Sequence, residues 1–320
     1  MKIHIPNSAW LGNIDQFLRS FETSNPQRLE ITTHKEWISV HPLVLSMVAA
    51  LGMTCEKSGV TSEQMEAKSK HYLKRMGLFD FLKIKTDIKI EEHESAGRFI
   101  PLTQIFNNEE LTRFITDVIP LLHLRPEQAQ PIRYVVSELT RNVFEHSRSK
   151  IGAIVCAQYF KKTNRISVGI VDTGVGIKKT ISESYPVKKD SEAIRLALTP
   201  GITGTTRRIG GTEFNAGAGL FFIKSIAKTN RNFFVIYSGS ALYKLLKTPT
   251  GKKVHLYGDS HQDKHSGGDS FPYWQGTAVG VDIGLDAKEE FSDLLKLINN
   301  TYSKTVKERK KEFYKKARFI

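Results

Sequence analysis

Short apolar runs alternate with polar segments over the first sixty residues of the chain. These runs predict strands at residues 2–5 and 28–32. Apolar positions at helical spacing predict helices at 11–21 and 42–51. Because strands and helices alternate here, residues 1–60 are expected to form a small α/β unit.

A longer unit is expected after a connector. Residues 61–97 are predicted to form the connector, because a basic helix expected at 63–76 is followed by a charged stretch without periodicity. From residue 98 to 285 the pattern of apolar and polar positions is long and regular. Residues 286–320 are predicted to form a last helix (286–302) that continues into a basic tail. Within the regular part, the expected helices lie at about 109–121, up to about 147, and at 220–228; the expected strands lie at 153–159, 166–171, 233–237, 242–247 and 277–283.

Composition narrows the class of protein. The 320 residues are 40% hydrophobic and 25% charged, which is typical of a globular chain with two domains. No apolar run approaches the ~18–20 residues that cross a bilayer, and no secretory signal is expected at the start. Cys55 and Cys156 are too few for a disulfide scaffold and are expected in the core. We therefore expect a cytoplasmic protein without a membrane span.

The positive charge is concentrated at one end. The formal net charge is +14, and residues 303–320 carry eight basic residues against two glutamates, with three aromatic residues between the lysines. A solvated helix end explains such a tail. A surface for an acidic or phosphate-bearing partner explains it as well, whether nucleic acid, a protein partner or a second subunit in a homodimer.

A first candidate motif lies near the end of the helix that closes at about residue 147. Glu138 and Asn142 are four residues apart, so they project from one face of this helix, opposite an apolar stripe. A carboxylate beside an amide oxygen suits an octahedral Mg²⁺ and a water held near it. Solvated surface is the ordinary explanation for such a pair, so the motif alone decides nothing.

A second motif follows a β-branched strand. Asp172 ends the strand, and Gly174 and Gly176, followed by Ile177, allow a tight turn that a flat ligand can approach closely. The carboxylate can accept a hydrogen bond from an exocyclic amine such as that of adenine. Thr277 begins a later strand and carries a hydroxyl that could support Asp172. A purely structural turn would explain the glycines equally well.

A third motif opens the helix expected at 220–228. Glycines before a helix N-terminus expose backbone N–H groups and the positive end of the helix dipole to phosphate. Residues 201–215, just before it, are rich in Gly, Thr and Arg, which suits a mobile lid over an anion. The motif consists of Gly217, Gly219 and the following Leu220. The expected lid contains the adjacent arginines Arg207 and Arg208.

In this order and spacing, the three motifs and Thr277 resemble the N, G1, G2 and G3 boxes of the GHKL superfamily, which includes gyrase-type ATPases, chaperones and histidine kinases. The resemblance covers residues 98–285. It implies a Bergerat-type ATP-binding domain, an α+β two-layer sandwich that holds ATP and Mg²⁺ between its sheet and its helices.

The resemblance also implies roles for individual residues. Asn142 would bind Mg²⁺, Glu138 would be the catalytic group that positions or activates the attacking water or hydroxyl, and Asp172, supported by Thr277, would bind the adenine amine. The roles of two further residues are left open. Arg141 would contact a phosphate or lie on the surface. His146 lies near the end of a helix, where its charged form is favourable. Gly174, Gly176 and Ile177 would let the base approach, and Gly217, Gly219 and Leu220 would cradle the phosphates.

The N-terminal unit weakly resembles a STAS domain, the fold of anti-sigma-factor antagonists. The resemblance rests on the strand, polar turn and apolar helix within residues 29–51. Val40 stands where that family places a phosphorylatable Ser, so any protein substrate is expected to be another chain.

Two functions fit these expectations. One is a regulatory ATP-dependent kinase or ATPase similar to the anti-sigma-factor serine kinases, for which Glu138 argues. The other is an ATP-gated interaction module with little hydrolysis, as in a stress or phage-defence system, for which the basic tail argues.

The segment 255–269 is rich in His and Asp. His261 and His265 have a spacing that suits a metal, whereas the glycines around them predict a flexible polar loop between strands.

Overall fold

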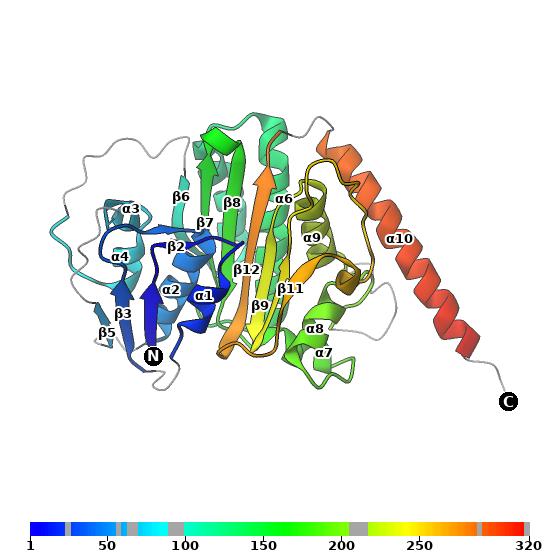
Figure 1. Cartoon of the computed structure of the whole chain (residues 1–320), viewed down its shortest axis with the longest axis horizontal. Coiled ribbons are helices and arrows are strands. Elements are labelled where there is room, and N and C mark those ends of the chain that lie inside the picture. Colours follow the sequence, from blue (N-terminus) through cyan, green and yellow to red (C-terminus); the bar gives the residue numbers. More distant parts are fainter. Residues whose placement is uncertain are drawn as a thin grey trace.

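The computed structural model describes residues 1–22, 27–55, 59–62, 70–88, 99–204, 217–286 and 290–316 of the chain. Its elements form three layers (Figure 1). A seven-stranded antiparallel sheet stands in the middle, helices cover one face, and the N-terminal segments cover the other. The protein is therefore a mixed α/β structure, as predicted.

The central sheet has the strand order β11-β10-β9-β12-β8-β7-β6, and all neighbouring strands are antiparallel. Its β7, β8, β9, β10 and β12 confirm the strands predicted from the sequence. β6 was not predicted, and β11 corrects the interpretation of 255–269 as a loop throughout, because a four-residue strand with two glycines has no apolar run. The bounds are β6 Phe99–Ile105, β7 Ala153–Phe160, β8 Arg165–Asp172, β9 Phe234–Gly239, β10 Ala241–Leu245, β11 His265–Gly268 and β12 Trp274–Gly284.

Helices α6 (Pro126–Asn142) and α9 (Gly219–Thr229) bury their apolar stripes against one face of this sheet. A π-helical turn, Val143–Ser147, extends α6 to the predicted end. The last helix, α10 (Phe291–Lys316), begins later and runs further than predicted and packs on α6 and α9. The helix expected at 109–121 is α5 (Asn108–Arg113) followed by π-helical (Phe114–Val118) and 3₁₀ (Ile119–Leu122) turns, and α7 (Gly176–Ser182) and α8 (Asp190–Ala197) lie before α9.

The N-terminal segments contain two small parallel sheets, of order β1-β3-β5 and β2-β4. The predicted strands at 2–5 and 28–32 are confirmed as β1 and β3, and the helix at 42–51 as α2, whereas the helix expected at 11–21 is only the short α1. The part of the helix expected at 63–76 before residue 70 lies outside the described residues. The bounds are β1 Lys2–Ile5, β2 Ser8–Ala9, α1 Asp15–Arg19, β3 Leu29–Thr33, β4 Ser39–Val40, α2 Pro42–Thr54, β5 Val60–Ser62, α3 Lys70–Arg75 and α4 Leu78–Leu82.

Helix α2 joins the N-terminal segments to the central sheet. Its residues Pro42–Ala50 are all buried, so the helix is covered on every side. Its apolar side chains share one core with Ile154, Cys156 and Val171 on the back of the sheet. The N-terminal segments thus form a third layer on the sheet. The sequence predicted instead a separate unit that precedes a two-layer sandwich. The unit boundaries at residues 60, 97 and 285 stay predictions. Among the described residues, no helix has the length and apolar character that a membrane span needs.

Candidate functional site

A cavity of about 230 Å³ lies between the C-terminal end of α6, the start of α9 and the ends of β8 and β12. Of the residues predicted to form the site, Gly174 alone is not part of its wall. The structure therefore brings together three motifs that are far apart in the sequence. The predicted residues in the wall are Glu138, Asn142, Asp172, Gly176, Ile177, Gly217, Gly219, Leu220 and Thr277.

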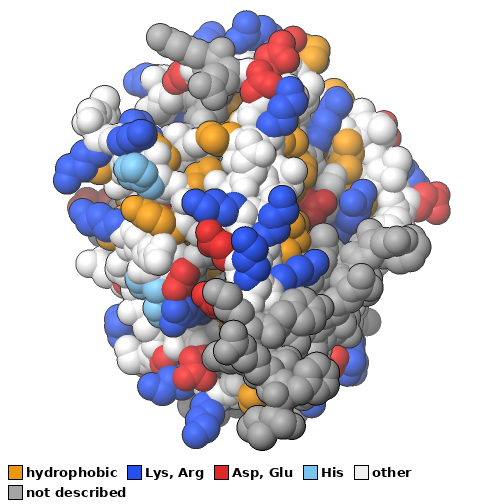
Figure 2. Space-filling model, turned by 90° about the vertical axis from the view of Figure 1, so that its right-hand side faces the viewer, with side chains coloured by type: hydrophobic (Ala, Val, Ile, Leu, Met, Phe, Trp, Pro, Cys, Tyr) orange, Lys and Arg blue, Asp and Glu red, His pale blue; other side chains and the backbone are white. Residues whose placement is uncertain are grey.

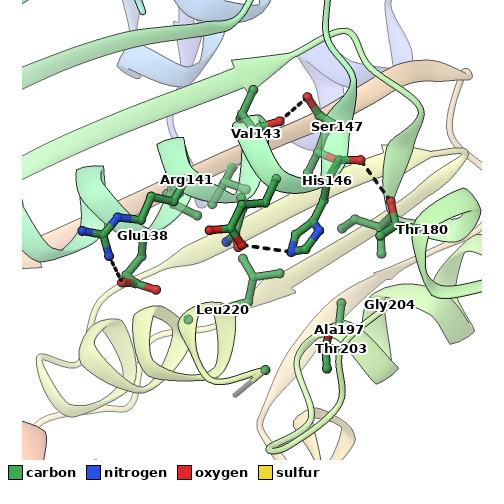
Figure 3. A pocket seen from close by; sticks show the side chains of 18 of the residues that line it. Glu138, Arg141, Val143, His146, Ser147, Thr180, Ala197, Thr203, Gly204 and Leu220 are labelled. Carbon is green, nitrogen blue, oxygen red and sulfur yellow. Dashed lines mark hydrogen bonds and ion pairs between the residues drawn. The ribbon is translucent and has the colours of Figure 1, made fainter. Parts of the chain in front are cut away.

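Glu138 and Asn142 lie one turn apart on α6 and face the start of α9. A Cβ added at Gly219 would lie 2.8 Å from Oε2 of Glu138 and 3.8 Å from Nδ2 of Asn142. Burial raises the pKa of Glu138, while Arg141, with Nη1 3.7 Å from Oε1 of Glu138, lowers it (Figure 3). Within the described residues, Nδ2 of Asn142 is buried and makes no hydrogen bond. Asn142 lines the cavity, and a buried amide nitrogen without a hydrogen bond from the described residues is available to a ligand.

The π-helical turn after Asn142 holds the glycine turn that follows β8. The carbonyl oxygen of Ser147 accepts a hydrogen bond from the backbone N–H of Val175 at 2.7 Å. A Cβ at Gly174 would overlap that carbonyl, so only glycine fits there. Gly174 thus contributes by letting two backbones approach. π-helical turns occur often at functional sites, because they shift the following side chains relative to an α-helix.

Asp172 is buried at the floor of the cavity, at the end of β8. Its Oδ1 accepts a hydrogen bond from the backbone N–H of Gly174 at 2.7 Å. Burial raises its pKa to about 7, and the backbone amides of Gly174 and Thr277 offset part of that rise. Thr277 is the cross-strand partner of Asp172 and supports it through its backbone amide, whereas the sequence pointed to its hydroxyl.

Ser238 at the end of β9 links the second motif to the strand that carries Thr277. Its Oγ accepts a hydrogen bond from the N–H of Ile177 at 3.0 Å and donates one to the carbonyl of Gly276 at 2.7 Å. Gly176 lies beside it with φ +77°, a conformation that favours glycine. Ser238 was not predicted to belong to the site, because a single hydroxyl at the end of an apolar strand is its only feature in the sequence.

The third motif closes the cavity on the opposite side. Gly217 has φ +63°, and a Cβ there would overlap the backbone of Ile202. Gly219 is the first residue of α9, so the N–H groups of the first turn, which have no partner within the helix, lie at the cavity wall. Arg207 and Arg208 lie outside the described residues, with the rest of 205–216.

The cavity wall also contains two residues whose roles the sequence left open. Arg141 and His146 both line it, together with Glu145 (Figure 3). Nε2 of His146 lies 3.7 Å from the Glu145 carboxylate, yet burial lowers the pKa of His146 overall. Burial therefore acts against the charged form that a helix end favours.

Segment 255–269 is held by ion pairs to the helices. Asp263 is buried and its carboxylate lies 2.6 Å from Nζ of Lys224 and 3.0 Å from Nζ of Lys228, both on α9. Asp259 forms two hydrogen bonds with Arg195 on α8. Within the described part of the chain, no group of three or more His, Cys, Asp or Glu side chains is arranged to hold a metal. These aspartates thus fix the segment on α8 and α9.

Comparison with known proteins adds no family, since no family model, curated protein or solved structure matches the chain.

Proposed function

We propose that the protein binds Mg-ATP in this cavity and transfers the γ-phosphoryl group, as a regulatory kinase or ATPase similar to the anti-sigma-factor serine kinases. One observation carries the proposal: Glu138 and Asn142 face Gly219 at the N-terminus of α9. A carboxylate, an amide and a row of helix-end N–H groups meet at one place. This combination suits phosphoryl transfer, which depends on positioning and on neutralising charge.

Asp172 would receive the adenine at the other end of the cavity. Its carboxylate is buried and aligned by two backbone amides, so a lone pair can accept a hydrogen bond from the exocyclic amine. Gly176 presents backbone without a side chain beside it. A flat base can therefore lie against this turn.

The residues present fit a bound Mg²⁺. This ion keeps several waters and takes few protein ligands besides phosphate oxygens, so a single amide side chain suffices. Asn142 has such an amide, buried and without a hydrogen bond from Nδ2 among the described residues; rotation by 180° would present its oxygen. When bound, Mg²⁺ neutralises charge on the phosphates. Asn142 would hold the ion, and the first N–H groups of α9 would bind phosphate oxygens.

Glu138 would hold the proton that the attacking water or hydroxyl loses. Its raised pKa makes the carboxylate a better base than an exposed glutamate. Arg141 contacts the carboxylate from the next turn and keeps it beside the start of α9. A site that only bound ATP would not require a carboxylate at this place, and its presence favours phosphoryl transfer over the ATP-gated interaction module.

The test uses γ-labelled ATP, Mg²⁺ and the whole chain, with free phosphate and labelled protein counted separately. We expect phosphate release or transfer, lost in Asn142→Ala and in Glu138→Gln. Glu138→Gln is expected to keep ATP binding, whereas Asn142→Ala is expected to weaken it at least tenfold. Asn299→Ala, at an exposed position on α10, is the matched control.

Two outcomes would contradict the proposal. Tight ATP binding by the wild-type protein without any phosphate movement would favour the ATP-gated interaction module. Absence of ATP binding would remove both functions.

A further inference from the structure

The basic residues from Lys304 to Lys311 belong to α10, whose preceding turns pack on the protein. Leu294, Ile298 and Val306 of α10 are buried at spacings of four and eight residues, on one side of the helix. The ring of Tyr302 lies 6.3 Å from that of Phe221 and 6.0 Å from that of Phe222, both on α9. α10 therefore has a packed face and an opposite, outward face, and Figure 1 shows its C-terminal end pointing away from the sheet.

The outward face carries a lysine stripe, which we define as Lys304, Lys307 and Lys311. All three are exposed, and their spacing of three and four residues places them on one side of the helix, where Glu308 is also exposed. Figure 2 looks onto the side of the molecule along which α10 runs, and Lys and Arg side chains gather in the middle of this face. The stripe is about 10 Å long, at 1.5 Å per residue.

We propose that the lysine stripe binds the phosphate backbone of a nucleic-acid duplex. Duplex DNA presents one negative charge per ~1.7 Å of its axis, so each lysine of a 10 Å row finds a phosphate. The row is preformed on a packed helix, so binding does not have to order it first.

The chemistry of the face favours a nucleic acid over an acidic protein. From Lys304 to Glu312, every exposed residue of α10 is a lysine or a glutamate. A stable protein interface needs apolar or aromatic anchors at its centre, and this stretch has none exposed. Lysines bound to phosphates fix position without reading sequence, so the binding is expected to be non-specific and sensitive to salt.

The experiment measures binding of the whole chain to a short labelled DNA duplex by fluorescence anisotropy, without nucleotide, from about 50 to 200 mM salt. The test variant is Lys304→Gln, Lys307→Gln and Lys311→Gln combined. The control combines Lys35→Gln, Lys150→Gln and Lys161→Gln, three exposed lysines outside α10, and removes the same charge. Circular dichroism checks that both variants keep the fold.

We expect the stripe variant to bind at least tenfold more weakly at low salt. The slope of log K against log salt is expected to fall by about 2.7, or about 0.9 for each lost phosphate contact. The control is expected to change the slope by less than about 1. Equal losses in both variants would mean that total charge alone drives binding and would overturn the proposal. Absence of duplex binding by the wild type, or equally strong competition by polyglutamate, would also overturn it. None of these outcomes depends on ATP.

Discussion

Gly169 of β8 and Gly280 of β12 are cross-strand partners, and Leu43 of α2 lies over both. A Cβ at Gly169 would overlap the backbone of Leu43, and one at Gly280 would lie 2.8 Å from Cδ2 of Leu43. Because the two glycines have no side chains, the first turn of α2 packs close to the backbone of the sheet at this place. The same strands carry the pair Asp172 and Thr277 three residues further along. The N-terminal layer therefore packs on the strands that form one end of the cavity.

We predict that Gly169→Ala lowers the free energy of unfolding by about 1–3 kcal/mol, because the new methyl group meets backbone that cannot rotate away. Gly280→Ala meets the ends of two side chains, Leu11 and Leu43, and its cost is expected to be smaller and less than additive with Leu43→Ala. Urea denaturation measures each value. Gly284→Ala, in the same strand as Gly280, is the control, because the nearest atom to its Cβ would be the Asn232 amide nitrogen at 3.3 Å. If all three alanine variants cost the same, α2 is not seated on the pair.

Asp172→Asn is predicted to stabilise the protein at pH 8 while abolishing most ATP binding. The folded-state pKa of Asp172 is about 7, above its value of ~3.9 in an unfolded chain. Between these values the folded state holds a proton that the unfolded state has lost, so stability falls as pH rises through about 7. Asparagine does not titrate, and its amide oxygen can still accept from the backbone N–H of Gly174.

The advantage of the asparagine variant is therefore expected to grow from pH 5 to pH 8, reaching on the order of 2 kcal/mol. Urea denaturation at both pH values measures it, and Asp117→Asn at an exposed position should show no such trend. ATP binding is expected to weaken at least tenfold. An asparagine variant that is less stable than wild type at pH 8 would contradict the buried-carboxylate argument.

The sequence predicted those parts of the fold that depend on local periodicity. Strands β7, β8 and β12 and helix α9 have long apolar patterns, and Glu138, Asn142 and Asp172, which the resemblance assigned to one site, line one cavity. The glycine pattern also located the start of α9, because helix-opening glycines have a local signature.

The remaining features depend on contacts between distant residues. Nothing near Gly169 or Gly280 shows that α2 will cover them, because the fit exists only once both strands and the helix are assembled. Ser238 is a lone hydroxyl until β9 pairs with β12. The charge state of His146 depends on burial, which a helix pattern does not give.

Replacing Asp263 is predicted to be among the most destabilising changes outside the cavity. Asp263→Asn would leave the ammonium groups of Lys224 and Lys228 buried without a counter-charge, at a cost of about 3–5 kcal/mol. Adding Lys224→Met should recover part of this loss, because it removes one of the two buried charges. Asp269→Asn, at an exposed position, is expected to cost less than about 1 kcal/mol. Chemical denaturation of the wild type and the three variants measures these costs, and an Asp263→Asn variant as stable as wild type would refute the ion-pair argument.

Gly219 and Gly217 are predicted to separate activity from stability. In Gly219→Ala the methyl group meets Oε2 of Glu138 at 2.8 Å, and this carboxylate can rotate away. Alanine also suits the first turn of a helix better than glycine. We expect unchanged or higher stability but at least tenfold slower phosphoryl transfer, because Glu138 leaves its place. Gly217→Ala combines φ +63° with backbone overlap at Ile202 and is expected to lose more than about 1 kcal/mol. Turnover and urea denaturation of both variants provide the comparison. Normal turnover in Gly219→Ala would show that the position of Glu138 beside α9 does not control the reaction.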